Sequence, residues 1–472
     1  MIGETLNTTQ LIDGVEGKLT VELFDAQTHR LQEKAMTTNF ISLAGIRHLK
    51  WAQRANYFKD GISSLNPSVH LDYEQPLTQD HIVLSGNTST ASPSTEWHML
   101  GKLIGYAGKY TYAGADTLLG SPNPSLCEAT PTYTKWVFDW PTNAGNGTIG
   151  SIGWMNIPAS YRGTGTLQAR AYSSATLQDS KSLSSTNLNR IARKSSTEYF
   201  FAQASSTTII TTDENFTQTG SFSVGTQFKA STQIHGIAWD DNTSRLWVLG
   251  LNASNASILA SYNASGALQS GPTTLTTRAY ESLTHDGTNL WSLVGTYGSF
   301  TAYRLSTAGN DVSSFSINLG AVQTLSYDEA AYAIGCHTPS QRLYIATYAR
   351  GTSGDYGGGS SIASSWTTSA IRGYDYSGNE TMVPVCTAVF EPSSASRFFP
   401  VRPGDDPDSF PYPSDIVIID EYQLLTMYRS NASSYRIWRI LLDGMGSRAL
   451  LPSPITKTNA QTLRITYQMD YT

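Results

Sequence analysis

A short phrase that recurs along the chain limits its fold more than any other feature. In residues 237–248 (IAWDDNTSRLWV) an apolar run enters a turn of Asp, Asn, Thr and Ser, and a second apolar run leaves it. This pattern is typical of a hairpin of two short, well-buried strands. It returns in residues 282–293 (SLTHDGTNLWSL) and 333–345 (AIGCHTPSQRLYI), with weaker copies in residues 191–201 and 416–427. The chain therefore contains five copies of one hairpin.

The spacing of the copies matches one blade of a β-propeller. Leu246 and Leu290 are 44 positions apart (290 − 246), and Leu290 and Leu343 are 53 apart (343 − 290), close to the roughly 40–50 residues of a four-stranded blade. The stronger copies and the last one are followed by a further apolar strand and a turn of small or polar residues; these strands are residues 258–262, 300–305, 371–376 and 435–442. We predict a mainly β chain with a propeller of five blades, six being the alternative count. A two-sheet sandwich with many hairpins is the alternative fold.

The charge and the hydropathy of the chain argue against two classes of protein, nucleic-acid binders and membrane-spanning proteins. The 472 residues include 31 basic and 37 acidic side chains, which gives a net charge of −6 without long blocks of either sign. A nucleic-acid binder would show a basic face, so we expect no nucleic-acid partner. No apolar run approaches the roughly 20 residues that span a bilayer, so we expect no membrane insertion. The first ten residues lack the features of a signal peptide, which predicts synthesis and folding in a cytoplasm.

The three cysteines predict neither a metal site nor a disulfide framework. Cys127, Cys336 and Cys386 are odd in number and too far apart for a zinc motif. We expect buried thiols that act as small apolar side chains.

The segment before the propeller reads as a β-rich domain with one helix. Residues 17–25 (GKLTVELFD) alternate apolar and polar side chains, and residues 31–36 form a returning strand. Asn39 stands where a helix N-cap belongs, and residues 40–58 have the pattern of the helix that would follow. Further strands are expected at residues 81–85 and 97–104. Residues 133–154 then predict a hairpin with an aromatic face that carries Trp136, Phe138 and Trp140.

Two of these stretches carry a resemblance to a known family. Residues 17–42 (GKLTVELFDAQTHRLQEKAMTTNFIS) and 136–154 (WVFDWPTNAGNGTIGSIGW) resemble the N-terminal domain of tailed-bacteriophage virion proteins, often tail or tail-tip components. Residues 454–471 (PITKTNAQTLRITYQMDY) resemble the terminal β-segment that completes the sheet of such domains. The resemblance covers roughly the first 170 and the last 20 residues. It implies a virion protein, made in the host cytoplasm, that contacts other virion proteins and forms a homo-oligomer in the particle.

The two halves of the resemblance predict a discontinuous domain. If residues 463–471 pair with strands near Gly17 or Trp136, the propeller is an insertion within the first domain, an arrangement that is tolerated when chain ends lie close together. We therefore predict an anchoring domain of residues 1–180 plus 453–472 and a propeller of residues 187–452. The predicted links are residues 171–187 and 448–455.

Several side chains are candidates for chemistry, each with a structural alternative. Asp240, Asp241 and Asp286 could form the carboxylate pair of a glycoside hydrolase, but Asp241 and Asp286 stand in the repeated turn, where Asp bonds its own backbone. Asp405, Asp406 and Asp408 could hold Ca²⁺, but they lack the ligand spacing of an EF-hand loop, which favours a solvated loop. The histidines at related blade positions have no metal-like partner spacing; they are His235, His285 and His337. The sequence contains no familiar catalytic or cofactor-binding motif, so we predict no cofactor.

The longest irregular segments belong to the predicted propeller. Residues 350–369 form one of them, and residues 388–413 form the other. Loops on a rigid scaffold are where binding sites concentrate, and aromatic side chains are common anchors of interfaces. The second segment supplies the candidate interaction residues, although they could also fold back over their own blade: Phe390, Phe398, Phe399, Phe410 and Tyr412.

These observations lead to one functional hypothesis and two alternatives. We expect a structural component of a tailed-phage virion, placed in the tail or an appendage, which anchors by its first domain and presents the propeller for contacts with proteins or the host surface. The alternatives are a depolymerase that degrades a surface glycan and a lectin-like receptor-binding propeller. The absence of a catalytic constellation favours a protein that is not an enzyme.

Overall fold

The structure is a computed structural model, and the described part of the chain comprises residues 15–38, 40–41, 45, 79–90, 96–108, 116–156, 176–182, 188–203, 206–229, 234–276, 278–296, 299–317, 328–351, 366–390, 413–429 and 435–471. The chain divides into two compact units. Unit 1 combines residues 1–166 with residues 444–472, and unit 2 is residues 167–443. Unit 1 is thus built from both ends of the sequence.

Unit 1 is a sandwich of two antiparallel sheets. One sheet has the order β2-β1-β31-β8-β6, with β7 also paired to β8, and the other has the order β3-β30-β9-β4-β5. The first sheet consists of β1 (Val15–Asp25), β2 (Leu31–Thr38), β6 (Ser121–Pro122), β7 (Glu128–Ala129), β8 (Tyr133–Trp140) and β31 (Gln461–Tyr471). The second consists of β3 (Phe40–Ile41), β4 (Gln79–Ser85), β5 (Leu103–Gly108), β9 (Gly147–Asn156) and β30 (Met445–Lys457).

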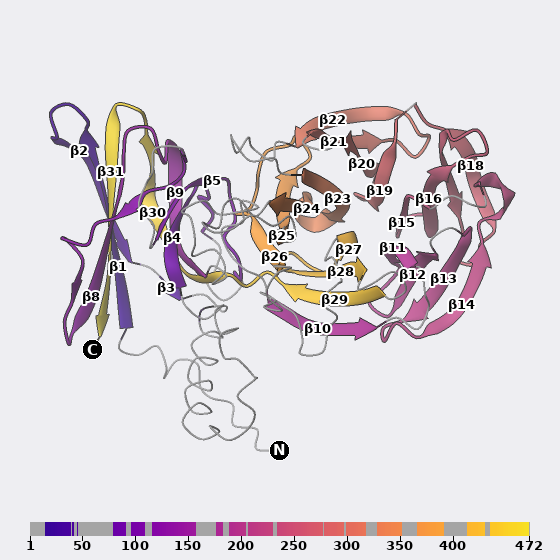
Figure 1. Ribbon diagram of the computed structural model, residues 1–472, viewed down its shortest axis with the longest axis horizontal. Coiled ribbons are helices and arrows are strands. Elements are labelled where there is room, and N and C mark those ends of the chain that lie inside the picture. The colour runs from indigo at the N-terminus through magenta and orange to yellow at the C-terminus, as the bar shows by residue number, and fades with distance from the viewer. Residues whose placement is uncertain are drawn as a thin grey trace, which may run out of the picture. The chain divides into compact units, whose positions relative to one another are not determined.

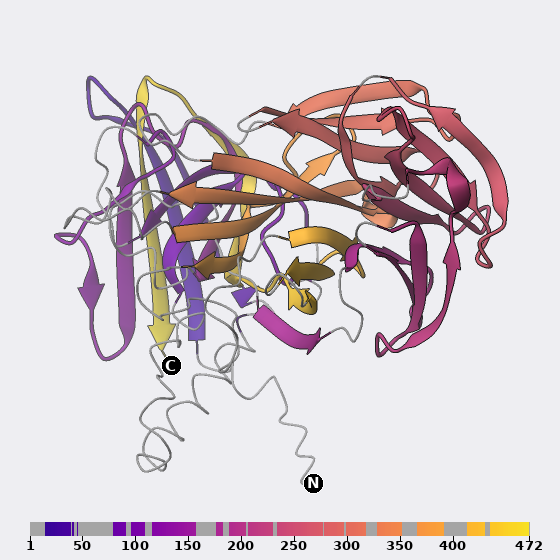
Figure 2. The same cartoon turned by 45° about the vertical axis from the view of Figure 1, so that its right-hand side comes forward.

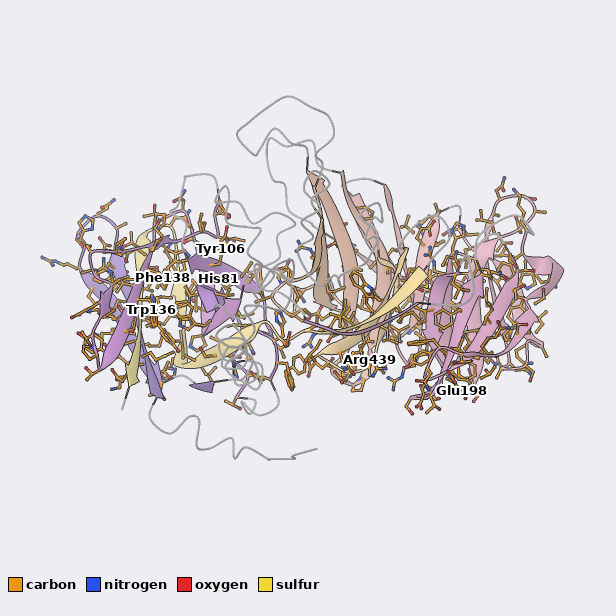
Figure 3. All side chains as sticks on the ribbon, turned by 60° about the horizontal axis from the view of Figure 1, so that its bottom comes forward. His81, Tyr106, Trp136, Phe138, Glu198 and Arg439 are labelled. Carbon is orange, nitrogen blue, oxygen red and sulfur yellow. The ribbon has the colours of Figure 1, made fainter. Side chains whose placement is uncertain are left out.

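Alternating side chains from both sheets form the sandwich core. On β31, Leu463, Ile465 and Tyr467 are buried, whereas the residues between them are partly exposed, as a strand with one face toward a core requires. Trp154 of the opposite sheet packs edge-on against Tyr467, with ring centroids 5.2 Å apart, and against Trp136 at 5.3 Å. Figure 3 labels Trp136 and Phe138 in this core. The predicted hairpin of residues 133–154 is wrong, because its two strands, β8 and β9, lie in different sheets, but its predicted aromatic face does line the inner face of the sandwich.

The C-terminal strand lies in the middle of the first sheet. Strand β31 pairs with β1, where Tyr467 faces Leu19, and with β8, where Ile465 faces Phe138. Figures 1 and 2 show this strand in yellow. The predicted pairing of residues 463–471 with the strands near Gly17 and Trp136 is confirmed.

Unit 2 is a β-propeller of five four-stranded antiparallel sheets. In Figure 1 the innermost strands β11, β15, β19, β23 and β27 form a ring around its axis, and each contacts the next.

Blade 1 contains β11 (Leu188–Arg193), β12 (Glu198–Gln203), β13 (Thr208–Asp213) and β14 (Gln218–Ser223). Blade 2 contains β15 (Gly236–Asp240), β16 (Arg245–Leu251), β17 (Ser257–Tyr262) and β18 (Leu268–Thr274), and blade 3 contains β19 (Tyr280–His285), β20 (Leu290–Thr296), β21 (Ser299–Leu305) and β22 (Asp311–Ile317). Blade 4 contains β23 (Asp328–His337), β24 (Arg342–Gly351), β25 (Trp366–Asp375) and β26 (Val385–Phe390), and blade 5 contains β27 (Pro413–Ile418), β28 (Gln423–Arg429), β29 (Tyr435–Leu441) and β10 (Thr176–Ser182). Among the described residues, short 3₁₀ turns cover Gly225–Gln227 and Thr338–Ser340.

The five repeated phrases of the sequence are the five inner hairpins. In blade 2, Asp240 pairs with Arg245 across the turn and Gly236 pairs with Leu249 at the far end. The corresponding hairpins are β11–β12, β19–β20, β23–β24 and β27–β28. The predicted propeller is confirmed, and the number of blades is five rather than six.

Blade 5 joins the two ends of the propeller segment. Its three inner strands come from the end of the segment, and its outer strand β10 comes from the beginning, with Thr176 opposite Leu441 and Ser182 opposite Arg436. Residues 171–187, predicted as a link, therefore contain a strand of the ring. Asp443-Gly444, predicted as a turn within the last blade, instead leads out of it because β10 already occupies the outer position.

Other boundaries in unit 1 also differ from the predictions. Residues 448–455, predicted as a link, lie within β30, where Arg448 forms a buried ion pair with Glu96 (Nε to Oε2, 2.7 Å). The second part of the sandwich thus begins near residue 444 rather than 453. The expected strand over residues 97–104 is displaced to β5, Leu103–Gly108. The predicted helix of residues 40–58 lies almost wholly outside the described residues, and its first two residues form β3.

Two buried polar residues link the inner strands of four blades with the residue that precedes the inner strand of blade 2. Asp415 of blade 5 accepts a hydrogen bond at Oδ2 from the Ile191 N–H of blade 1 (2.9 Å) and at Oδ1 from the Ser282 hydroxyl of blade 3 (2.9 Å). The same hydroxyl oxygen accepts from the Ile334 N–H of blade 4 (3.1 Å). The Ser282 N–H donates to the carbonyl of His235, which precedes the inner strand of blade 2 (2.8 Å). We call Asp415 and Ser282 the axial hub.

Glycines in the outer turns allow neighbouring blades to pack closely. Gly266, between β17 and β18, has a φ of +86°, and a Cβ added there would lie 2.5 Å from the Phe222 ring of the preceding blade. Gly378, between β25 and β26, has the same φ, and its added Cβ would lie 2.6 Å from the Phe315 ring of the blade before it. Both the backbone conformation and the approach require glycine. The small-residue turns that mark the repeat are therefore contacts between blades.

A first prediction concerns the C-terminal strand. Truncation after Thr458 removes β31 from between β1 and β8 and exposes the core face of both, at a cost that exceeds the typical total stability of about 5–15 kcal/mol. We expect the sandwich to unfold and the propeller to stay folded. Limited proteolysis with mass spectrometry measures this, with a chain shortened by Thr472 alone as the control. Loss of the propeller before the sandwich would contradict it.

A second prediction concerns the axial hub. Burial raises the pKa of Asp415 to about 6, above the ordinary value of 3.8. Because the folded protein then binds this proton more tightly than the unfolded chain, the stability that the proton supplies is complete below about pH 4 and is lost as the pH rises through about 6. Relative to Asp415→Asn, which does not titrate, the wild type should lose about 2–4 kcal/mol of unfolding free energy between pH 4 and pH 7. Urea unfolding at both pH values measures this difference, and an equal change in both proteins would contradict it.

Candidate functional site

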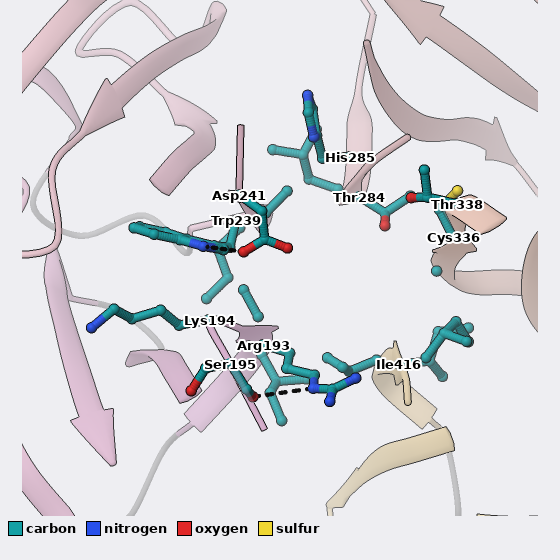
Figure 4. A pocket seen from close by; sticks show the side chains of 18 of the residues that line it. Arg193, Lys194, Ser195, Trp239, Asp241, Thr284, His285, Cys336, Thr338 and Ile416 are labelled. Carbon is teal, nitrogen blue, oxygen red and sulfur yellow. Dashed lines mark hydrogen bonds between the residues drawn. The ribbon is translucent and has the colours of Figure 1, made fainter. Parts of the chain in front are cut away.

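A cavity opens at one end of the propeller axis, where the inner strands finish. Its volume is about 430 Å³, within the range of small-ligand pockets. Figure 4 shows Trp239 and Asp241 on one side, Cys336 and Thr338 on the opposite side, and Arg193 along the wall between blades 1 and 5. We call this cavity the axial funnel. The repeat positions it, because each inner hairpin turns at this end of the ring.

The aromatic side of the funnel is formed by Trp239, at the end of β15. Its ring is half-buried and packs on Phe200 of blade 1, with centroids 5.4 Å apart. Its indole N–H donates to Asp241 Oδ1 at 2.8 Å, and Asp241 itself is exposed. The Trp239 ring is thus held by the Phe200 ring and by the hydrogen bond of its N–H to Asp241.

The cationic side of the funnel is formed by Arg193 and Lys194, where β11 ends. The Arg193 Nε donates to the Ser195 carbonyl at 3.1 Å, and its Nη1 donates to the Ile419 carbonyl of blade 5 at 3.0 Å. Lys194 forms an ion pair with Glu198 at 2.7 Å. The guanidinium is therefore held in place by two neutral oxygens, whereas the ammonium already has a carboxylate partner.

Two further titratable side chains of the funnel, His285 and Cys336, are uncharged near neutral pH. Burial lowers the pKa of His285, against the opposing effect of Asp240, so its imidazole is neutral. Burial raises the pKa of the Cys336 thiol to about 11, although a hydrogen bond with the Tyr376 hydroxyl (3.2 Å) opposes the shift. A neutral thiol is a poor nucleophile.

The prediction that the turn aspartates bond their own backbone is confirmed for Asp286 and wrong for Asp241, whose place in the blade-2 turn is taken by Asp240. Asp286 accepts hydrogen bonds from the Thr288 and Asn289 amides, and its other oxygen accepts from the Trp291 indole at 2.8 Å. Arg304 forms an ion pair with it at 2.8 Å. Asp240 likewise accepts from its own turn, through the Asn242 and Thr243 amides and the Thr243 hydroxyl. Burial alone would raise the pKa of Asp240, but these hydrogen bonds and His285 outweigh it and lower the pKa.

The other two predicted histidines are separated along the axis. His235 lies at the opposite end of the axis from the funnel, where its Nδ1 is 3.1 Å from Glu281 Oε1, and Arg190 pairs with the other oxygen of Glu281 at 2.8 Å. His337 lies in a blade-4 turn and contacts the Ser340 hydroxyl through Nδ1 at 2.7 Å. Burial lowers the pKa of His337. The structure therefore does not bring the three histidines together.

The predicted interaction and calcium residues fall mostly outside the described part of the chain. Phe390 ends β26, at the end of the blade opposite the funnel, and its side chain is not among those described. The remaining candidates lie wholly outside the described residues; they are Phe398, Phe399, Phe410, Tyr412, Asp405, Asp406 and Asp408. Within the described residues, no group of three or more His, Cys, Asp or Glu side chains could hold a metal ion. Nor does any helix there have the length and apolar character to span a membrane.

The residues that give the funnel its aromatic and cationic character, above all Arg193 and Trp239, were not predicted from the sequence. Each stands at the end of a predicted inner strand, directly before the turn of the repeated hairpin. In a closed ring these positions meet around the axis. A comparison of the last two strand residues of each repeat copy would have included both of them.

Comparisons with known proteins find distant likenesses among solved structures. The chain is similar to the crystal structure of RRP9 WD40 repeats at 12% identity, over 60% of this chain and 86% of that chain, with a TM-score of 0.30. It is similar to Myxococcus xanthus glutaminyl cyclase at 10% identity (59% and 97% covered, TM-score 0.35) and to the PQQ-bound aldose sugar dehydrogenase from Streptomyces coelicolor at 10% identity (57% and 98%, TM-score 0.33). No family model matches the sequence, and no curated protein matches it significantly. At such identities and scores these likenesses carry no functional argument, and the five four-stranded sheets themselves define the propeller.

A third prediction tests the state of the funnel thiol. With a pKa of about 11, Cys336 should resist alkylation by iodoacetamide at pH 8 in the folded protein and react readily after unfolding in urea. Peptide mass spectrometry after timed labelling measures its modification separately from that of the other cysteines. Rapid labelling of Cys336 in the folded state at pH 8 would show an activated thiolate and contradict the prediction.

Proposed function

We propose that the chain is a non-catalytic binding protein of a tailed-phage virion, anchored by the sandwich and carrying the propeller as its binding unit. The observation that carries the binding role is the chemistry of the funnel. Its described lining contains one carboxylate, Asp241, together with a neutral imidazole and a protonated thiol. Hydrolysis of a glycan requires a pair of carboxylates across the scissile bond, and thiol chemistry requires a thiolate. The described funnel suits ligand binding rather than either reaction.

The aspartates that a hydrolase would need are engaged elsewhere. Both Asp240 and Asp286 are buried and hold their own turns, and Asp286 also balances Arg304. Burial alone would raise the pKa of Asp240, but the hydrogen bonds from its own turn and His285 lower it, so this carboxylate is a poor general acid. These contacts favour binding over catalysis.

The anchoring role rests on how the sandwich is built. The strands that resemble the phage domain, β1, β8 and β31, are adjacent in one sheet, and the propeller segment lies between them in sequence. An independent core of this kind, with a large insertion, suits a protein fixed to a particle through one unit while the other makes contacts. Other virion proteins are the proposed partners of the sandwich, in a homo-oligomeric arrangement.

A fourth prediction tests both parts of this proposal. Antibodies to the chain should label purified particles in electron micrographs, and the purified chain should release no sugars from a host-envelope preparation. Asp286→Asn should lower the thermal stability of the propeller, because it loses the charge that balances Arg304, and should leave that absence of sugar release unchanged.

Two results would contradict the proposal. Unlabelled particles would refute the virion assignment. Sugar release by the wild-type chain that is abolished in a folded Asp286→Asn variant would identify a glycoside hydrolase instead.

A further inference from the structure

Arg193 differs from the other well-fixed arginines of the propeller. Arg190, Arg304 and Arg342 each form an ion pair, with Glu281 at 2.8 Å, Asp286 at 2.8 Å and Glu421 at 2.6 Å. The two partners that the structure describes for the Arg193 guanidinium are the carbonyl oxygens of Ser195 and Ile419. These oxygens fix its position, and no carboxylate of the described residues pairs with its charge.

The position of Arg193 makes this charge available to a ligand. The residue is half-buried, lines the funnel and is held between blade 1 and blade 5, so its guanidinium is ordered before any ligand arrives. Because the guanidinium is planar and keeps its charge, it suits the paired oxygens of a carboxylate. A donor that is already ordered loses little entropy on binding.

The charge distribution of the chain directs an anion to the funnel rather than to the protein surface as a whole. The net charge is −6, so the protein as a whole repels anions. The described funnel residues instead carry two cations, Arg193 and Lys194, against one carboxylate, Asp241, and Lys194 is neutralised by Glu198. An anion would therefore be drawn to the guanidinium rather than to the surface in general.

The rest of the lining fits a ring that carries hydroxyl groups. Trp239, fixed by Phe200 and Asp241, offers part of an aromatic surface to the cavity, against which the apolar C–H face of a sugar ring can pack. The hydroxyls of Ser195, Thr284 and Thr338 line the same space. Such groups make neutral hydrogen bonds with sugar hydroxyls.

We propose that the axial funnel binds acidic saccharides, with the sugar carboxylate on the Arg193 guanidinium and the sugar ring against Trp239. This inference rests on the binding role proposed above and adds the class of ligand. A uronic-acid oligosaccharide meets both requirements at once. An acidic peptide would satisfy the guanidinium but would leave the aromatic and hydroxyl surfaces without a matched partner.

The test compares matched ligands on the full-length chain by isothermal titration calorimetry. Trigalacturonate should bind, and neutral galactotriose of equal length should bind roughly 10- to 100-fold more weakly, the effect of one charge-assisted pair. Arg193→Gln should abolish this preference. Arg245→Gln, on the same hairpin as Trp239 but outside the described funnel lining, is the matched control and should keep it.

Arg193→Gln also removes a contact between two blades and could destabilise the propeller. A second variant therefore tests the proposal without removing that contact. Asp241→Asn removes the negative charge of the funnel and keeps an oxygen for the Trp239 indole. It should strengthen trigalacturonate binding by roughly 2- to 5-fold and leave galactotriose binding unchanged. Both variants should show the wild-type thermal unfolding midpoint within a few degrees before their affinities are compared.

The outcomes separate this inference from the proposed function. Equal binding of the two trisaccharides, binding of neither, or tighter binding of a triglutamate peptide would overturn the acidic-saccharide assignment and leave a non-catalytic virion protein standing. Cleavage of trigalacturonate during the titration, followed by chromatography of the products, would overturn the proposed function instead.

Discussion

The propeller depends on a small polar centre inside an otherwise apolar ring. Asp415 and Ser282 make hydrogen bonds with the inner strands of the other blades or, in blade 2, with the residue just before that strand, at a depth where an unpaired polar group would cost about 1–3 kcal/mol. Ser282 reaches this position through a left-handed backbone conformation, with a φ of 58°, at an irregularity of β19. Serine rarely adopts this conformation, so the surrounding contacts must hold it there. The rotational order of the blades is therefore specified by directed bonds as well as by apolar packing.

The two ends of the axis, on either side of the hub, differ in their charges. On one side of it, Arg190, Glu281 and His235 satisfy one another. On the other side, the funnel keeps an arginine whose described partners are neutral carbonyls beside a fixed indole. The same fold thus produces one end with balanced charges and one end that can accept a ligand.

Sequence patterns predicted the parts of this structure that repeat and missed those that depend on closure. The inner hairpins were recognisable because their apolar runs and polar turns recur, and β31 was recognisable from the alternation of Leu463, Ile465 and Tyr467. Strand β10 was missed because TLQDSKS, as an outer strand, has no clear alternation, and its partner β29 lies more than 250 positions away. Pro452 and Pro454 suggested a break, yet β30 accommodates them at a register shift between Leu450 and Ile455. The setting of Arg193 could not be read from sequence, because the Ile419 carbonyl that fixes it is 226 positions distant.

The way the propeller segment joins the sandwich has a further consequence. Strands β9 and β30 are neighbours, with Met155 opposite Met445, so the sandwich is interrupted where an ordinary hairpin would turn. The two ends of the propeller are also neighbours, with Thr176 opposite Leu441. Each unit therefore presents a closely spaced pair of chain ends, and neither fold has to stretch to accommodate the other. In evolution, the sandwich could accept other inserted domains: any domain whose chain ends lie side by side could replace the propeller without a change in the two sheets.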